Sequence, residues 1–248
     1  MLLSHMERLV DANSVAGIRD SYFDALNGHG YSCAFYGASF QSDLPPAVIR
    51  EDPEIHSNFP GDFIEEMRRY HPFGTSPWMI WADSHAGSIP LAQLVSESRH
   101  DPGMVRALEI ASQHGAASLR IISLKGRVAR ARGLVAICPA LMARPAEEAA
   151  LWLRNHREIA TLTAIMHMRM ATICRHPQRS GLTPRQREVL EWTSAGKTVA
   201  EVATILGLTP ATVEKHLRLA RDALDAGSTA QAILKAHVTN QIFLQKTA

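Results

Sequence analysis

Apolar residues recur at helical spacing near the end of this 248-residue chain. Four of them lie at steps of four, three and four positions: Val213, Leu217, Ala220 and Leu224. That spacing places the four side chains on one face of a helix, where they can pack against other helices. Lys215 and Arg218 then project from the opposite side. The pattern therefore predicts a helix with a buried stripe and an exposed basic face.

The same region carries three signals for the start of a helix, each a threonine whose side chain can cap the first turn. They are Thr183 before Pro184, Thr198 with Glu201 three residues later, and Thr209 before Pro210. Gly196 and Gly207 stand where helices must end, because glycine adopts the left-handed conformation of a helix C-terminus without steric cost. The order predicts a helix-turn-helix motif, and we expect the helix after Thr209 to lie in the major groove of DNA.

A set of residues with characteristic spacing runs through this region: Leu182-Thr183, Arg185, Glu188-Val189-Leu190, Trp192, Gly196-Lys197-Thr198, Glu201-Val202-Ala203, Leu206, Thr212-Val213 and His216-Leu217. In that order the stretch resembles the C-terminal DNA-binding domain of LuxR-type bacterial transcription regulators. The resemblance implies that Lys197 and Thr198 hold the DNA backbone. It implies further that the next helix reads bases. The candidate contacts at and along that helix are Thr209, Thr212, Glu214, Lys215 and Arg218.

Hydrophobic patterning before this region predicts both helices and strands. An amphipathic stretch from Leu9 to Leu26 predicts a helix, and the aromatic-rich segment from Tyr31 to Phe40 predicts a strand packed on both faces. A proline-rich loop follows. Asp62 then begins a short helix to Tyr70, and the segment from His71 to Pro77 is expected to be irregular.

The rest of the N-terminal part continues the mixture. Asp101-Pro102 predicts a helix ending at Gly115, and two strands, 119–124 and 133–138, flank a turn at Lys125-Gly126. A long helix is expected from Ala146 to about Ile173. The fold class predicted is α+β, with an N-terminal antiparallel sheet carrying helices on its faces and a C-terminal all-α helix-turn-helix domain.

The polar, proline-broken segment between the long helix and Gly181 predicts the domain boundary. We therefore expect a sensor and dimerisation domain over 1–174, a linker over 175–180 and the DNA-binding domain over 181–248. A helix starting at Ala230-Gln231-Ala232 is implied, by the same resemblance, to help form the dimer contact.

Composition places the chain among soluble globular proteins, with 46% hydrophobic and 20% charged residues. It has no apolar run of about 18 residues, and its first residues lack the order of a signal peptide, so we expect a cytoplasmic protein that does not enter membranes. The three cysteines, Cys33, Cys138 and Cys174, are far apart in apolar settings, which favours reduced thiols over a disulfide or zinc set.

Net charge is only +2, and its distribution matters more than its size. From Gly181 onward there are eight Lys and Arg against six Asp and Glu, so the whole surplus lies in the C-terminal part. Thr209 to Arg221 holds three basic residues and one acidic residue. So small a basic patch predicts weak binding by a monomer and favours a homodimer on palindromic double-stranded DNA.

Catalytic and metal chemistry find little support in the sequence. Met166 and Met170 share a helical face beside His167, but on a long helix this is more typical of gap-filling methionines and a solvated histidine than of ligands. Other histidines are scattered, no glycine-rich phosphate loop follows a strand, and Cys138 has no nearby base. We expect no enzymatic activity, no metal and no cofactor.

The N-terminal part resembles the autoinducer-binding domain of quorum-sensing LuxR-type regulators, aligned on Ser76-Pro77 and Gly115. That family binds acyl homoserine lactones through polar and aromatic anchors, whose positions here hold Phe63, Met67, Ser76 and Leu91, while Trp78 replaces a small pocket residue. Each unpaired polar atom of such a ligand would cost about 1–3 kcal/mol, so we expect little or no lactone response. Two alternatives follow: the domain folds without a ligand around its own aromatic side chains, or it accepts a different, more apolar molecule through Tyr36, Phe59, Tyr70 and Trp81.

The function predicted is a sequence-specific transcription regulator of the quorum-sensing LuxR type with a divergent or absent lactone response. Two alternatives remain open. One is an ordinary acyl homoserine lactone receptor, and the other is a regulator that acts through a hetero-complex with a partner regulator.

Overall fold

The computed structural model describes residues 2–40, 53–98, 101–173 and 181–242. The chain divides into two compact units that part between Ala171 and Thr172. The first combines a sheet with helices and the second is helical, which confirms the predicted fold class. Cys174 and the predicted linker, 175–180, lie outside the described residues.

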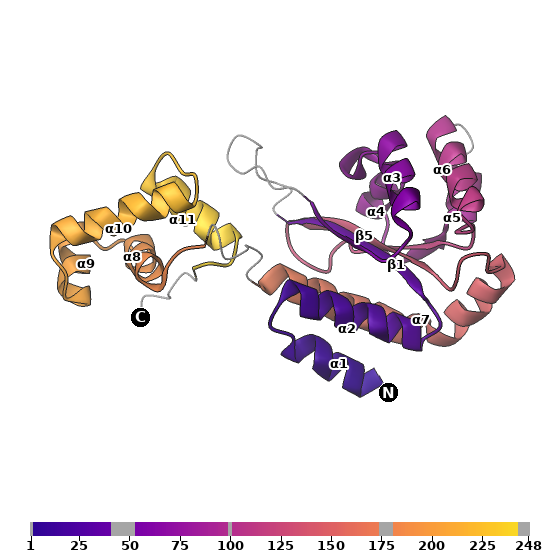
Figure 1. Ribbon diagram of the computed structural model, residues 1–248, viewed down its shortest axis with the longest axis horizontal. Helices are drawn as coiled ribbons and strands as arrows, with labels where there is room; N and C mark the ends of the chain where they lie inside the picture. The colour runs from indigo at the N-terminus through magenta and orange to yellow at the C-terminus, as the bar shows by residue number, and fades with distance from the viewer. Residues whose placement is uncertain (1, 41–52, 99–100, 174–180, 243–248) are drawn as a thin grey trace. The chain divides into compact units, whose positions relative to one another are not determined.

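In the described part of the chain, five strands form one antiparallel sheet in the order β2-β1-β5-β4-β3 (Figure 1). They are β1 (Cys33–Phe40), β2 (Glu54–Ser57), β3 (Ser88–Pro90), β4 (Arg120–Ser123) and β5 (Ala131–Cys138). β1 and β5 pair along their whole length, from Cys33 opposite Cys138 to Phe40 opposite Ala131. β4 and β5 pair as the predicted hairpin.

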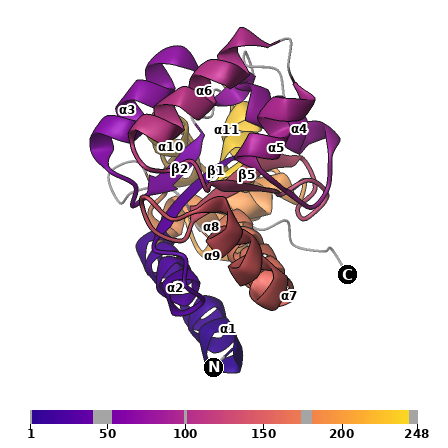
Figure 2. The ribbon, with the colours of Figure 1, turned by 90° about the vertical axis from the view of Figure 1, so that its right-hand side faces the viewer.

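Helices cover both faces of the sheet, so the N-terminal unit has three layers (Figures 1 and 2). One face carries α2 (Val15–Gly28) and α7 (Pro145–Thr172), and α1 (Leu2–Asp11) packs on the outer side of α2. The other face carries α3 (Gly61–Tyr70), the 3-10 turn Phe73–Thr75, α4 (Pro77–Ser84), α5 (Leu91–Glu97) and α6 (Pro102–Gln113). Between the two layers, most residues of β1, β4 and β5 are buried.

Alternation along β1 decides which side chains meet which layer. Phe35 packs against the apolar core under α3 to α6. Its neighbour Tyr36 faces α7 instead, where its hydroxyl lies 3.1 Å from Nδ1 of His167. At Gly37 the ring of Phe73 lies against the strand, and an added Cβ would collide with it. The glycine thus lets the 3-10 turn pack directly on the sheet.

Several elements differ from the sequence-based prediction. The opening apolar pattern predicts one helix, but Ser14 interrupts it by capping α2, its Oγ accepting a hydrogen bond from Gly17 N–H at 3.0 Å. β2 forms within the predicted loop, and nothing in the local pattern predicts β3, α4 or α5. These are short elements, and β2 and β3 exist because their backbone groups pair with β1 and β4.

The methionine-rich segment of α7 is a core face. Met166 and Met170 are buried, as predicted for gap-filling residues. His167 was expected to be solvated, and that expectation is wrong: its side chain is 0% exposed, stacked on Phe40 with ring centres 5.4 Å apart. Across the described ranges, no three His, Cys, Asp or Glu side chains could hold a metal ion. No helix in those ranges is both long and apolar enough to cross a membrane.

A buried ion pair ties β4 to α7. The Arg120 guanidinium donates two hydrogen bonds to the Glu148 carboxylate, at 2.6 and 2.9 Å, and both side chains are almost fully buried. The Tyr31 hydroxyl donates to the same carboxylate at 3.2 Å, and the guanidinium lies 4.5 Å above the Trp152 ring. Burial, followed by the negative charge of Glu148, raises the pKa of Tyr31. The network satisfies charges that would otherwise be costly inside a protein.

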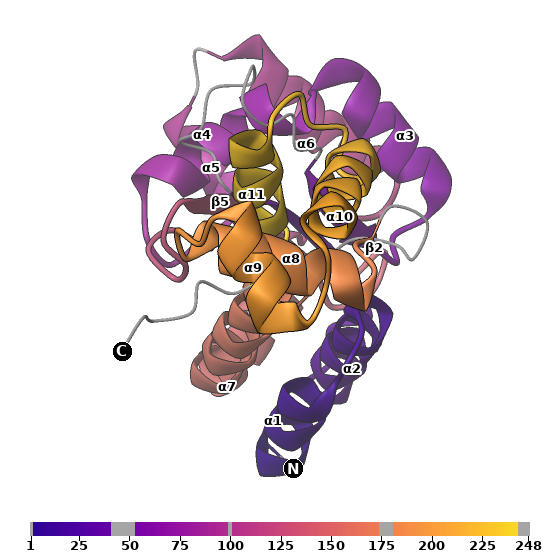
Figure 3. The same cartoon turned by 90° about the vertical axis from the view of Figure 1, so that its left-hand side faces the viewer.

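The C-terminal unit is a small helical bundle (Figure 3). Its helices are α8 (Pro184–Ser194), α9 (Val199–Leu206), α10 (Pro210–Ala223) and α11 (Thr229–Val238). The three predicted threonine caps open α8, α9 and α10, while Ser228 caps α11. Apolar residues from all four helices form one core.

Candidate nucleic-acid interface and apolar cavity

α10 separates an apolar face from a polar one. Val213, Leu217 and Ala220 are buried in the core of the C-terminal unit, as their spacing predicts. On the other side Glu214, Lys215 and Arg218 are exposed. A helix about 10 Å across with such an exposed face has the size and chemistry to enter a DNA major groove.

A short turn fixes the start of α10. Gly207 adopts a left-handed conformation with φ of 64°, and the N–H of Leu208 donates back to the Ala203 carbonyl at 2.8 Å. Thr209 then caps α10, its Oγ1 accepting from the N–H of Thr212 at 3.2 Å. From the side, Arg185 of α8 donates to the Leu206 carbonyl at 2.8 Å. These contacts fix the C-terminal end of α9 and the N-terminal end of α10.

Thr198 and Lys197 lie at the start of α9. The Thr198 Oγ1 accepts a hydrogen bond from Glu201 N–H at 3.3 Å and donates one to the Glu201 carboxylate at 2.8 Å. Hydrogen bonds from the backbone and hydroxyl of Thr198 hold the pKa of Glu201 below its ordinary value. Thr198 is exposed and Lys197 half-buried, so both can reach an anion at this helix N-terminus.

The basic side chains of α10 differ in their surroundings. Arg218 lies 3.5 Å from the Asp222 carboxylate one turn later, with both side chains about 60% exposed. Such an exposed pair is worth about 0–1 kcal/mol, so a phosphate or guanine edge can replace Asp222. Lys215 makes no hydrogen bond or ion pair with any residue that the structure describes.

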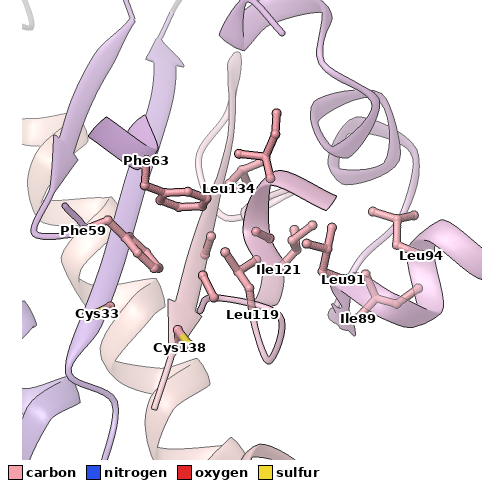
Figure 4. Close-up of a cluster of buried hydrophobic side chains, with 14 of the residues drawn as sticks. Cys33, Phe59, Phe63, Ile89, Leu91, Leu94, Leu119, Ile121, Leu134 and Cys138 are labelled. Carbon is pink, nitrogen blue, oxygen red and sulfur yellow. The ribbon is translucent and has the colours of Figure 1, made fainter. Parts of the chain in front are cut away.

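The second candidate site is a cavity of about 80 Å³ in the N-terminal unit, between the sheet and the layer containing α3. Many of its lining residues belong to the buried apolar cluster of Figure 4. The cavity is lined by Phe35, Ile55, Phe59, Phe63, Ile64, Met67, Arg68, His71, Phe73, Trp78, Leu91, Leu119, Ile121, Leu134 and Ala136. Of these fifteen residues, Arg68 and His71 alone carry strongly polar side chains.

The structure brings five of the nine residues predicted for a ligand pocket together around this cavity: Phe59, Phe63, Met67, Trp78 and Leu91. The other four do not line it. Tyr36 points to the opposite face of the sheet, and Tyr70 is 49% exposed beside Arg106. Ser76 is fully buried and donates to the Phe73 carbonyl at 2.9 Å, while Trp81 stacks on His85.

The anchor positions predicted to have lost their polar chemistry are apolar in space as well. Phe63, Met67 and Leu91 present carbon and sulfur to the cavity, and the Ser76 hydroxyl already has its acceptor. The Trp78 indole lines the wall and meets the His71 ring edge-on at 4.9 Å. A neutral polar head group would find few hydrogen-bond partners inside.

The sequence did not predict the lining residues that come from the sheet, such as Phe35 and Ile55, or the two polar ones, Arg68 and His71. Phe35 could have been chosen over Tyr36 only with the register of β1, and Ile55 only with the knowledge that β2 pairs with it. Arg68 follows Met67 directly, so proximity in sequence was the one available signal.

The C-terminal unit is similar in sequence to known proteins. Residues 180–236 match the family described as "Bacterial regulatory proteins, luxR family". The HTH-type quorum sensing-dependent transcriptional regulator RpaR of Rhodopseudomonas palustris is 35% identical over 83 residues, 34% of each chain. The transcriptional activator protein AnoR of Acinetobacter nosocomialis is 37% identical over 79 residues, 30% of this chain and 33% of AnoR. These matches span about a third of each relative's length.

The chain shares its fold with solved structures of SdiA. Escherichia coli SdiA aligns with a TM-score of 0.57 and 18% identity over 98% of both chains. SdiA in complex with octanoyl-rac-glycerol aligns with a TM-score of 0.55 and 18% identity, over 96% of this chain and 93% of SdiA. At this identity the likeness shows the fold alone.

Proposed function

Since the C-terminal unit is a helix-turn-helix domain of the luxR family of bacterial regulatory proteins, we propose that the chain is a sequence-specific DNA-binding transcription regulator rather than an enzyme. One observation carries the proposal. α10 turns Lys215 and Arg218 outward, while the buried stripe of the same helix fixes its orientation in the domain. Arg218 can contact a guanine edge with two hydrogen bonds, and Lys215 can contact a base or a phosphate.

The regulator acts as a homodimer on two-fold symmetric DNA. A single α10 offers few positive charges, and the chain as a whole carries only +2. A dimer doubles the contacts and reads two half-sites about one helical turn apart. Lys197 and Thr198 hold the backbone beside each half-site, and α11 contributes to the contact between copies. Because its target is chromosomal DNA, the protein works in the cytoplasm.

Footprinting and gel shifts on genomic fragments test this proposal. We expect wild-type protein to protect a palindromic site, and Lys215→Ala or Arg218→Ala to weaken specific binding by about 1–3 kcal/mol and relax preference at one base position per half-site. Lys197→Ala should weaken all sequences alike. Arg69→Ala, which removes one exposed positive charge from α3, is the matched control and should bind as wild type does.

A monomeric footprint on asymmetric DNA would contradict the proposal, as would salt dependence and sequence preference left untouched by all three variants of the DNA-binding unit. A stable hetero-complex with a second regulator in pull-downs would instead support the alternative in which a partner protein supplies part of the recognition.

For the N-terminal unit we propose a sensing role with a divergent ligand. Its cavity lies beneath α3, and SdiA, which shares the fold, has a solved structure in complex with octanoyl-rac-glycerol, a lipid-like compound. Phe63, Met67 and Leu91 offer no hydrogen bond to a lactone or an amide. We therefore expect acyl homoserine lactones to bind poorly, because their polar atoms would be buried without partners.

A thermal-shift series measures this directly. A ligand at a hundred times its dissociation constant stabilises a protein by about 2.7 kcal/mol, which raises the melting temperature visibly. We expect no shift with acyl homoserine lactones at micromolar concentration. A clear shift with any of them would restore the interpretation of an ordinary quorum-sensing receptor.

A further inference from the structure

The charged side chains of α3 are paired with one exception. The Glu66 carboxylate lies 3.2 Å from the Arg106 guanidinium and 3.0 Å from Nε2 of His114. The Asp62 carboxylate lies 3.7 Å from Nδ1 of the same histidine. Glu65 and Arg69 lie 3.8 Å apart. Arg68, the fifth, makes no hydrogen bond or ion pair with any described residue. The neighbouring carboxylates are thus engaged by other cations, and none of the carboxylates that the structure describes is paired with Arg68.

Arg68 stands where the apolar cavity meets the protein surface. It lines the cavity together with Ile64, and the same two residues line an adjoining surface hollow with Gly61, Glu65 and Arg69. The Arg68 side chain is exposed, so its guanidinium is hydrated in the absence of a ligand. A molecule that enters from this hollow passes Arg68 before it reaches Phe59, Phe63 and the sheet.

Inside the cavity the walls offer almost nothing polar. Thirteen of the fifteen lining residues are apolar or aromatic, and the Nε2 atom of His71 is already 3.0 Å from the Gly103 carbonyl oxygen. A ligand must therefore place an apolar body inside and its polar head at the mouth. A head with one negative charge complements Arg68, since guanidinium binds carboxylate through two parallel hydrogen bonds.

We infer that the cavity takes a monocarboxylic acid with a compact apolar body, whose carboxylate is bound by the Arg68 guanidinium at the mouth beside α3. This inference rests on the sensing role proposed above for the N-terminal unit. It differs from a lactone receptor in the charge of its ligand and in the residue that binds the head group. The small volume, well below the roughly 300–1,000 Å³ of pockets for drug-sized ligands, favours a short body.

Calorimetric titration of the full-length protein tests the inference with hexanoate, octanoate and 3-phenylpropanoate, each beside its methyl ester. The ester keeps the apolar body and loses the charge. For at least one acid, we expect the ester to bind about ten- to a hundredfold more weakly, which is the range for a charge-assisted hydrogen bond.

Two variants of α3 supply the matched comparison. Arg68→Gln should lower the affinity for the acid by about ten- to a hundredfold and leave the ester affinity unchanged. Arg69→Gln removes the same charge from the next residue, which lines the outer hollow but not the cavity, and should bind the acid as wild type does. Both side chains are exposed, so melting temperatures should confirm that the fold is intact.

Three outcomes would overturn the inference: equal affinity for acid and ester, an acid affinity unchanged by Arg68→Gln, or no binding of any probe by folded wild-type protein. Gel shifts run with the same preparations, without ligand, keep the failures separate. Loss of DNA binding in wild-type protein would count against the proposed regulator, whereas intact DNA binding without acid recognition would count against Arg68 alone.

Discussion

Arg120 and Glu148 bring opposite charges into the interior of the N-terminal unit. Only 6% of Arg120 and 3% of Glu148 is exposed, and Tyr31, Ser88 and Trp152 also contact the pair. Removing a charge from water costs several kcal/mol, which the partner offsets only when the geometry is good. Here two short hydrogen bonds provide that geometry. Removing one member of the pair should therefore lower the free energy of unfolding more than replacing both.

We expect Arg120→Met to lower the free energy of unfolding by about 3–5 kcal/mol, because Glu148 would remain buried without its partner. Urea denaturation of the full-length protein measures the change. Arg132→Met is the matched control, since Arg132 pairs with Asp83 where both side chains are about one-third exposed, and it should cost less than about 1 kcal/mol.

The double variant Arg120→Met with Glu148→Met should recover most of the loss, because two apolar side chains leave no unpaired charge. A loss from Arg120→Met no larger than that of the Arg132 control would show that the buried pair adds little to stability.

At the scale of elements, the turn between α9 and α10 determines how the candidate base-reading helix is presented. Gly207 reverses the chain, Thr209 caps α10, and Arg185 fixes the end of α9. The side chain of Thr209 also lies 2.9 Å from the Thr212 hydroxyl, so two candidate DNA contacts are hydrogen-bonded to each other before DNA binds. Local capping thus serves both the stability of the helix and the geometry of its binding face.

We expect Thr209→Ala to destabilise the C-terminal unit by about 1 kcal/mol, the usual cost of losing a threonine cap. Thr204→Ala is the control: Thr204 is also exposed, but it lies inside α9, where alanine is the better helix former. Circular dichroism during urea denaturation follows both variants. Equal effects of the two substitutions would mean that the cap does not stabilise α10.

At the scale of the whole molecule, charge and chemistry are divided between the two units. The C-terminal unit exposes basic side chains on α10, while the N-terminal unit encloses an apolar cavity with Arg68 at its mouth, a cation that is paired with no carboxylate in the described part of the chain. With a net charge of only +2, the chain lacks the long-range electrostatic attraction that would bind it to DNA regardless of sequence. In the proposed function, specific contacts and a second copy supply the affinity, so footprint symmetry is the informative measurement.

Sequence alone was sufficient where the relevant interactions are local. The caps at Thr183, Thr198 and Thr209, the left-handed Gly207 and the apolar stripe of α10 each depend on residues a few positions apart. Their chemistry follows from spacing, so the helix-turn-helix could be placed and its outward-facing residues chosen from the sequence. The hairpin of β4 and β5 and the long helix α7 were predictable for the same reason.

Tertiary structure decided what depends on register and on distant partners. Both Phe35 and Tyr36 suit a buried strand, and only the pairing of β1 with β5 assigns Phe35 to the cavity side and Tyr36 to α7. The short strands β2 and β3 form because other strands pair with them. Arg120 forms its ion pair with Glu148, which lies 28 residues away in the sequence. Arg68 is distinctive only because its neighbours are paired elsewhere, and no pattern along the chain records which charges will meet once it folds.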